Sequence, residues 1–130
     1  MKCLVVEDDD LLVSVLHDHL EDLRHQVTIA STIKDAMRCM RTDHYDLLLI
    51  DFHLPDGDTV SVSEYAGMFQ PGIMTILLTG TSAFPNGEHK VLAPCIDWVL
   101  RKPVRLEDLS ALVSYVEEQN TSIRVPHGVI

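Results

Sequence analysis

Basic residues are scarce in this sequence, and long apolar runs are missing. The 130 residues include 10 Lys and Arg against 20 Asp and Glu, which gives a net charge of −10. A nucleic-acid surface needs a basic patch, so we expect no nucleic-acid partner. No apolar run approaches the ~20 residues of a membrane span, and acidic residues follow Met1 too soon for a signal peptide. We therefore expect no membrane association and a cytoplasmic location.

Cysteines are also few, and their spacing excludes the common metal and redox motifs. Cys3, Cys39 and Cys95 are odd in number and form no CxxC pair. Cys3 lies in an apolar run and Cys39 in a helical pattern. Buried free thiols in a reducing compartment are the expected state.

The sequence has no internal repeat, low-complexity tract or linker to a second domain. Its hydrophobic content of 46% and charged content of 23% are those of an ordinary globular protein. We expect one domain over residues 1–120. The tail at 121–130 is too short to fold alone, and no effector domain is expected.

Apolar runs alternate with segments of helical spacing along the whole domain. The expected strands lie at 3–6, 26–30, 47–50, 73–78 and 96–100. Helices are expected from an Asp10 cap, from a Thr32/Asp35 capping box, and at 58–69, about 88–93 and 106–119. The helix at 88–93 is expected to be short or distorted. This alternation predicts an α/β fold: a doubly wound, five-stranded parallel sheet in flavodoxin-like order 2-1-3-4-5, with helices on both faces.

Polar residues follow four of these strands, where ligands bind in such sheets. Glu7 and Asp8 end the first strand, Asp51 the third, Thr79 the fourth and Lys102 the fifth. Because the carboxyl ends of parallel strands meet at one edge, these groups are expected to converge. Alone, each has a simpler explanation: an acidic first helical turn, a helix or loop cap, a strand end or a solvated loop. All four at successive strand ends form a much more specific pattern.

This combination suits a metal-assisted aspartyl phosphorylation site. Carboxylates held within a few ångströms repel one another, and a divalent cation relieves that repulsion. All-oxygen ligation suits Mg²⁺. The metal and the Lys102 ammonium can neutralise a phosphoryl group on Asp51, while the Thr79 hydroxyl can hydrogen-bond its oxygens.

The chain resembles the receiver domain of bacterial two-component response regulators over residues 2–119. The resemblance rests on residues 4–9, 46–57, 78–80 and 101–103, which read LVVEDD, DLLLIDFHLPDG, LTG and RKP. It implies a phosphorelay component that takes its phosphoryl group from a phosphohistidine. The donor would be a sensor histidine kinase or a histidine phosphotransfer protein.

The resemblance also implies a role for each site residue. Asp51 would be the phosphoacceptor, Thr79 the switch hydroxyl and Lys102 the phosphoryl-contacting lysine. Glu7, Asp8 and Asp51 would hold Mg²⁺, with Asp8 the more direct ligand. The backbone carbonyl of His53 would be a further ligand.

Two features depart from the family pattern. Val99 stands three residues before Lys102, where the family usually places an aromatic residue that swings inward on activation. Trp98 is adjacent, but strand alternation points it to the opposite face. The poorly patterned fourth helix lies beside the same surface, which is the family's usual output face.

The histidines form no metal-binding pair, since His17 and His19 are two apart on a helix and share no face. They are expected to be solvated or packed. His53 differs because its side chain should stand at the mouth of the site. We hypothesise that it modulates water access and thus the lifetime of phosphorylated Asp51.

Three functions are compatible with these residues. The first is a stand-alone receiver, not a turnover enzyme, which signals by binding a downstream protein or another copy of itself. The second is a receiver-fold binding module whose output no longer depends on phosphorylation. The third is an aspartate-nucleophile phosphohydrolase of the haloacid dehalogenase type. Enzymes of that type carry a DxD pattern at the end of the first strand. Here the expected nucleophile ends the third strand, and His53 stands where the second Asp of that pattern would be.

Overall fold

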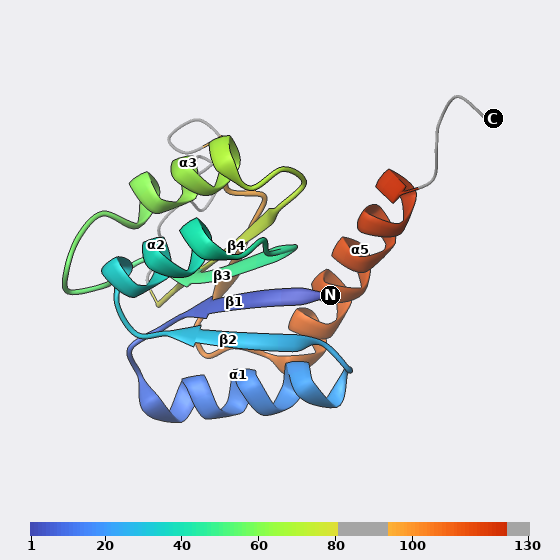
Figure 1. Cartoon of the computed structure of the whole chain (residues 1–130). Coiled ribbons are helices and arrows are strands. Elements are labelled where there is room, and N and C mark those ends of the chain that lie inside the picture. Colours follow the sequence, from blue (N-terminus) through green and yellow to red (C-terminus); the bar gives the residue numbers. More distant parts are fainter. Residues whose placement is uncertain (81–93, 125–130) are drawn as a thin grey trace.

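The computed structural model describes residues 1–80 and 94–124 of the chain. Five parallel strands form one sheet in the order β2-β1-β3-β4-β5 (Figure 1). The strands are β1 (Lys2–Val6), β2 (Gln26–Ala30), β3 (Leu47–Asp51), β4 (Met74–Thr79) and β5 (Trp98–Arg101). The predicted α/β class and strand order are therefore confirmed.

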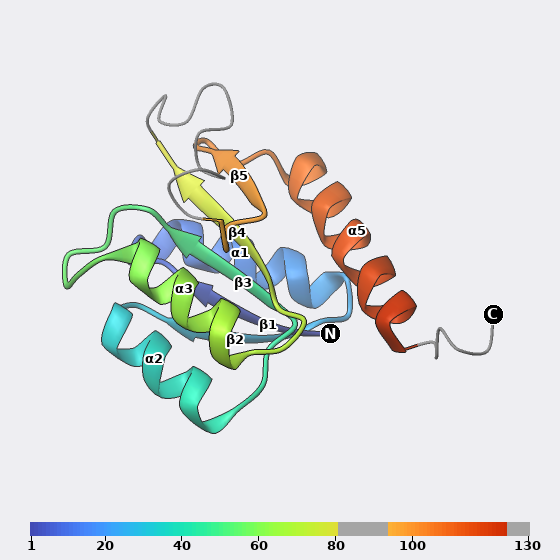
Figure 2. The same ribbon diagram turned by 90° about the horizontal axis from the view of Figure 1, so that it is seen from above.

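Helices cover both faces of the sheet, as expected. They are α1 (Asp10–Asp22), α2 (Ile33–Thr42), α3 (Thr59–Phe69) and α5 (Leu106–Arg124). Figures 1 and 2 show α2 and α3 together on one face, with α1 on the other. The short helix predicted at 88–93 lies outside the described residues. Within the described segments, no helix has both the length and the apolar character needed to cross a bilayer.

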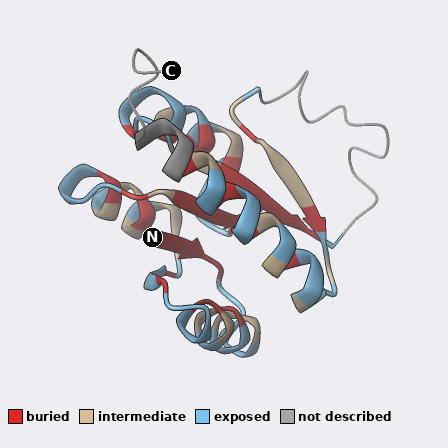
Figure 3. Cartoon of the chain, turned by 90° about the vertical axis from the view of Figure 1, so that its right-hand side faces the viewer, coloured by how far each residue is buried: buried red, intermediate tan, exposed pale blue. Residues whose placement is uncertain are grey.

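The central strands are buried on both faces, which explains their continuous apolar runs. Alternate residues of β1 and β3 face opposite sides: Leu4 and Leu48 pack in the core under α2 and α3, whereas Val5 and Leu49 pack in the core under α1 and α5. Figure 3 shows this buried centre with exposed residues on the outer helix surfaces. The two apolar layers fix the sheet, and with it the positions at which the strands end.

Several element boundaries differ from their predictions. Asp9, not Asp10, caps α1, and its carboxylate accepts a hydrogen bond from Leu12 N at 3.0 Å. Strand β5 begins at Trp98 rather than at 96, because its pairing with β4 starts at Ile76 opposite Trp98. Ile96 is fully buried without being part of the strand. The apolar run at 96–100 therefore reflects burial, whereas the start of β5 is set by its hydrogen bonding to β4.

The predicted cap of α2 is confirmed, and a second side chain reinforces it. Thr32 Oγ1 accepts a hydrogen bond from Asp35 N at 3.1 Å. The Asp56 carboxylate, from the loop after β3, accepts from Ile33 N at 2.9 Å and from Lys34 N at 3.2 Å. These backbone hydrogen bonds, that from Ile33 first, lower the pKa of Asp56. The loop that follows Asp51 is thereby attached to α2.

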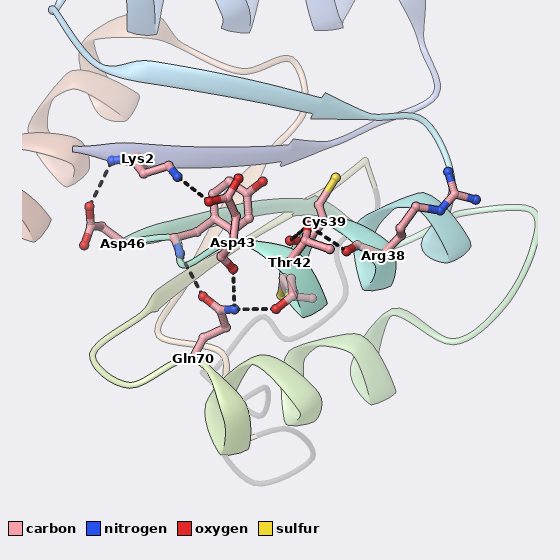
Figure 4. Close-up of polar contacts among 9 residues, drawn as sticks. Lys2, Arg38, Cys39, Thr42, Asp43, Asp46 and Gln70 are labelled. Carbon is pink, nitrogen blue, oxygen red and sulfur yellow. Dashed lines mark hydrogen bonds and ion pairs between the residues drawn. The ribbon is translucent and has the colours of Figure 1, made fainter.

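A buried amide joins α3 to the loop between α2 and β3 at the amino edge of the sheet (Figure 4). Gln70 is 3% exposed. Its Nε2 donates to Met40 O at 2.8 Å and to Asp43 O at 2.9 Å, and its Oε1 accepts from Tyr45 N at 2.8 Å. Each hydrogen-bonding group of this side chain thus has a backbone partner.

The three cysteines are free, as predicted. Cys3 is fully buried, and burial raises the pKa of its thiol to about 12. Cys39 and Cys95 are only half-buried, so the expectation of burial holds for Cys3 alone.

Candidate functional site

The residues predicted to form the site lie at the ends of β3 and β4 or directly after β1 and β5, at the carboxyl edge of the sheet. Strand β1 lies between β2 and β3. The chain adds β2 on one side of β1 and then β3, β4 and β5 on the other, so the direction in which strands are added reverses at β1. Loops that leave β1 and β3 diverge at such a reversal and leave a crevice. The register places Val6 opposite Ile50 and Asp51 opposite Leu78. The residues after these strands therefore emerge at one level.

Glu7 is a fully buried carboxylate at the bottom of this site. Its Oε2 accepts hydrogen bonds from Asp8 N at 2.9 Å and Asp9 N at 3.4 Å. Its Oε1 lies 2.8 Å from Lys102 Nζ. Oε1 is sealed from solvent, and among the described residues its partner is the Lys102 ammonium. The bottom of the site is therefore a place where positive charge is favoured.

Asp51 ends β3 and is 4% exposed. Its Oδ1 accepts a hydrogen bond from His53 N at 3.2 Å and lies 3.5 Å from Lys102 Nζ. The next residue, Phe52, donates its N–H to Leu78 O at 2.8 Å, which extends the attachment of this chain to β4. The carboxylate of Asp51 is therefore held at a rigid strand end.

Oxygen atoms of Glu7, Asp8 and Asp51 lie within 4.8 Å of one another. Two unit negative charges 4 Å apart repel by about 4 kcal/mol at an effective dielectric of 20. The ammonium of Lys102 offsets part of this repulsion, and solvent screens the charge of the exposed Asp8. A hard divalent cation fits this site, because the close carboxylates supply oxygen ligands and their repulsion is only partly offset by the ammonium.

Lys102 follows β5 and connects two sides of the site. Its backbone N–H donates to Thr79 O at 2.7 Å, and its ammonium lies between the Glu7 and Asp51 carboxylates. Burial lowers the pKa of Lys102, but the hydrogen bond and charge of Glu7, with the charge of Asp51, outweigh it and raise the pKa above its ordinary value. Lys102 is therefore a stable cation at neutral pH. The peptide bond between Lys102 and Pro103 is cis.

Thr79 ends β4 and is fully buried. It lies opposite Arg101 in the register with β5, and its carbonyl accepts the Lys102 N–H. The structure thus places Thr79 next to the predicted lysine. Its role as a switch hydroxyl stays a prediction, as does metal ligation by the carbonyl of His53, an exposed residue two positions after Asp51.

Trp98 and Val99 face opposite sides of β5, as strand alternation predicted. Trp98 packs in the core under α1 and α5, where its ring meets Tyr115 edge-on at 5.6 Å between centroids. Val99 packs against the core under α2 and α3. No rotation of the Trp98 side chain alone can bring its indole to the face that Val99 occupies.

Sequence reasoning missed Thr59, whose side chain reaches the end of β3. Its hydroxyl donates to Asp51 O at 2.9 Å and lies 3.1 Å from Phe52 O. The signal for this contact in the sequence is weak, because a threonine near the start of a helix usually hydrogen-bonds to the first turn of that helix.

The chain is similar in sequence to known response regulators. The two-component response regulator ORR23 of Oryza sativa is 30% identical over 131 residues, which cover 95% of this chain and 18% of that protein. The chain therefore spans less than a fifth of that curated relative's length.

Two solved structures share the fold and part of the sequence. A CheY-like response regulator receiver domain protein from Methanospirillum hungatei is 27% identical, with a TM-score of 0.81, and covers 93% of this chain and 97% of its own. The receiver domain of the sensor histidine kinase PA1611 from Pseudomonas aeruginosa is 25% identical with a TM-score of 0.76. It covers 88% of this chain and 94% of its own, and holds a magnesium ion in its active-site cleft.

A family model, the response regulator receiver domain, matches residues 3–114, which is most of the chain. The convergence of Glu7, Asp8, Asp51 and Lys102 at one sheet edge is the arrangement that the resemblance implied. The chain belongs to the response regulator receiver domain family.

Proposed function

We propose that Asp51 accepts a phosphoryl group from a phosphohistidine of a sensor histidine kinase or a histidine phosphotransfer protein. The observation that carries this proposal is the position of a nearly buried carboxylate between two other carboxylates and an ammonium. Phosphoryl transfer requires mainly positioning and charge neutralisation, and this site supplies both.

In the proposed step, a carboxylate oxygen of Asp51 forms a bond to phosphorus as the donor's P–N bond breaks. The bonding electrons return to the imidazole nitrogen, which takes up a proton from solvent. Lys102, 3.5 Å from Asp51 Oδ1, would neutralise part of the added charge. The hydroxyl of Thr79 would donate a hydrogen bond to a phosphoryl oxygen.

Glu7, Asp8 and Asp51 would hold the Mg²⁺ that receiver domains use, with the carbonyl of His53 as a further ligand. When bound, the ion would neutralise charge on the carboxylates and the phosphoryl oxygens. Support comes from the clustered carboxylate oxygens and from the burial of the Glu7 carboxylate among them. The magnesium in the Pseudomonas aeruginosa receiver domain supports it further.

We further propose that the chain acts as a cytoplasmic switch and not as a turnover enzyme. Phosphorylation adds nearly two negative charges. These charges shift the balance between two preexisting conformations by the difference between their interaction free energies with the phosphoryl group. The output would be association with a downstream protein or with a second copy.

Transfer from a labelled phosphohistidine donor tests the acceptor. Wild type is expected to take up label only with Mg²⁺, and Asp51→Asn is expected to take up none. Asp46→Asn is the matched control, because Asp46 lies just before the opposite end of β3 and bonds Lys2 N. Label on Asp51→Asn, or equal loss in Asp46→Asn, would contradict the proposal.

A second candidate is a binding module whose output does not depend on phosphorylation. Val99 favours it, since this face of β5 offers no aromatic side chain to swing inward. Beryllofluoride with Mg²⁺ separates the two candidates. A switch is expected to change amide hydrogen exchange and partner affinity, whereas a binding module keeps both despite an occupied site.

A further inference from the structure

Thr59 is a buried hydroxyl at the start of α3 that bonds outside its own helix. It is 2% exposed. Its Oγ1 donates to Asp51 O at 2.9 Å, and Phe52 O lies within reach at 3.1 Å, so one proton is shared between two carbonyls. Both carbonyls belong to the backbone that carries the phosphoacceptor.

The peptide group between Phe52 and His53 connects this hydroxyl to the acceptor carboxylate. Its carbonyl, Phe52 O, is bound by Thr59, and its N–H, at His53, donates to Asp51 Oδ1 at 3.2 Å. The carbonyl and N–H of a peptide group lie in one plane, so fixing one fixes the direction of the other. Thr59 thus aims the His53 N–H at the acceptor oxygen.

The preceding peptide group is fixed in the same way. Its carbonyl, Asp51 O, is bound by Thr59, while its N–H, at Phe52, donates to Leu78 O at 2.8 Å. Both peptide units after the acceptor are therefore held at both ends. The loop has no freedom to rotate them without breaking a hydrogen bond to Thr59.

The surrounding helix start holds Thr59 in place. The Asp58 carboxylate accepts hydrogen bonds from Val60 N at 2.9 Å and Ser61 Oγ at 3.0 Å, which caps α3 directly before Thr59. One turn later, the buried Ser63 Oγ donates to Thr59 O at 3.1 Å. The hydroxyl of Thr59 is therefore anchored to a rigid element.

We infer that Thr59 is a positioning residue for the phosphoacceptor, acting through the 52–53 peptide on the Asp51 carboxylate. The inference rests on the proposed function of Asp51. Thr59 touches neither donor nor metal, and its effect is to keep one carboxylate oxygen oriented by the His53 N–H. The other Asp51 oxygen is then presented to a cation or to phosphorus.

Substitution of the hydroxyl tests this role. Thr59→Val keeps the shape and removes the donor, and is expected to weaken binding of Mg²⁺ and beryllofluoride about tenfold by calorimetry, as is usual for groups behind a metal ligand. Thr59→Ser keeps the hydroxyl and is expected to bind as wild type does. If the valine variant does not fold, Thr59→Ala removes the donor without placing a methyl against the carbonyls.

Ser63→Ala is the matched control, because it also removes a buried hydroxyl from α3, but that hydroxyl donates to Thr59 O within the helix and not to the carbonyls of Asp51 and Phe52. It is expected to lose stability while keeping wild-type affinity. Wild-type affinity in Thr59→Val, or equal weakening in Ser63→Ala, would overturn the inference.

A metal-free readout separates this inference from the proposed function. Amide exchange at His53 is expected to lose protection in Thr59→Val and to stay protected in Thr59→Ser. If wild type binds no Mg²⁺ or beryllofluoride, the proposed function fails, and the exchange result still decides the positioning role. Unchanged His53 protection in Thr59→Val would refute it.

Discussion

Polar side chains at the amino edge of the sheet bond to one another, whereas at the carboxyl edge carboxylates face one another across a single lysine. At the amino edge, Lys2 Nζ lies 2.9 Å from Asp43 Oδ1, and Lys2 N donates to Asp46 Oδ2 at 2.9 Å. Gln70 is saturated by three backbone partners. Opposite charges and complementary hydrogen-bonding groups meet there, as Figure 4 shows.

The carboxyl edge is built differently. Glu7, Asp8 and Asp51 place three negative groups within 4.8 Å of one another. Lys102 supplies the one cation that the described residues bring to them, at 2.8 Å from Glu7 and 3.5 Å from Asp51. One edge is thus organised for stability and the other for ligands that bring positive charge, a difference that substitutions can test.

The largest expected effect is at the amino edge. Gln70→Leu leaves Tyr45 N, Met40 O and Asp43 O without their partner in a buried place, where each unsatisfied group costs about 1–3 kcal/mol. We expect a loss of about 3 kcal/mol in the free energy of unfolding by urea denaturation. Mg²⁺ affinity of the folded protein is expected to stay unchanged. The exposed Gln26→Leu serves as control, and equal losses in both would contradict the role of the buried amide.

Lys102→Met is expected to cost about 2 kcal/mol in the absence of metal. It leaves the fully buried Glu7 Oε1 without its ion pair, and the loss stays below that of a deeply buried pair because Lys102 is 28% exposed. Added Mg²⁺ is expected to restore most of the stability, since it can replace the missing positive charge. Lys34→Met, at an exposed position, is the control. A variant that Mg²⁺ does not stabilise would contradict the ligand role of this edge.

Asp8→Asn is expected to stabilise the metal-free protein by about 1 kcal/mol. It removes one of the mutually repelling charges, and Asp8 is exposed enough for solvent to weaken the effect. The same change is expected to weaken Mg²⁺ binding. Asp10→Asn, on the first turn of α1 and outside the cluster, should do neither. Unfolding curves measured with EDTA decide, and a destabilised Asp8→Asn would argue against repulsion.

The smallest expected effect is a pH dependence at the amino edge. His25 is buried there, with its Nδ1 3.0 Å from the Met1 amine and 3.9 Å from Glu117. Burial, and then the charge of that amine, lower the pKa of His25 below its ordinary value of 6.5. The unfolded chain therefore binds the proton more readily, so stability present above pH 6.5 is lost as the pH falls through the folded value.

Unfolding free energies between pH 7 and pH 5 check this sign. His25→Gln is expected to flatten the profile over that range, with His44→Gln, an exposed position, as control. Equal slopes in wild type and His25→Gln would show that other groups cause the dependence.

The sequence predicted the site better than it predicted the elements around it. Strand ends converge by a rule of parallel sheets, so Glu7, Asp8, Asp51 and Lys102 could be placed together from local patterns alone. The start of β5 could not, since the apolar Ile96 is buried outside the ladder, and pairing with β4 depends on a neighbour far along the chain.

Contacts made across loops were also beyond local patterns. Asp56 lies in a turn sequence, but nothing in that turn indicates that its carboxylate caps α2, 23 positions earlier. The Gln70 network joins residues 25 to 30 positions apart. Thr59 returns over eight residues to Asp51, which requires the whole β3–α3 loop to be folded first. These side chains hold backbone groups in place and take no part in the proposed reaction, so their residue types alone do not predict their contacts.

Site mapping of the phosphoryl group tests the central claim most directly. The protein is incubated with acetyl phosphate, with Mg²⁺ or with EDTA, and the modified residue is located by tandem mass spectrometry. We predict one phosphoryl group on Asp51 that requires Mg²⁺. Modification of a different carboxylate, or equal modification of Asp51 with EDTA, would contradict the account.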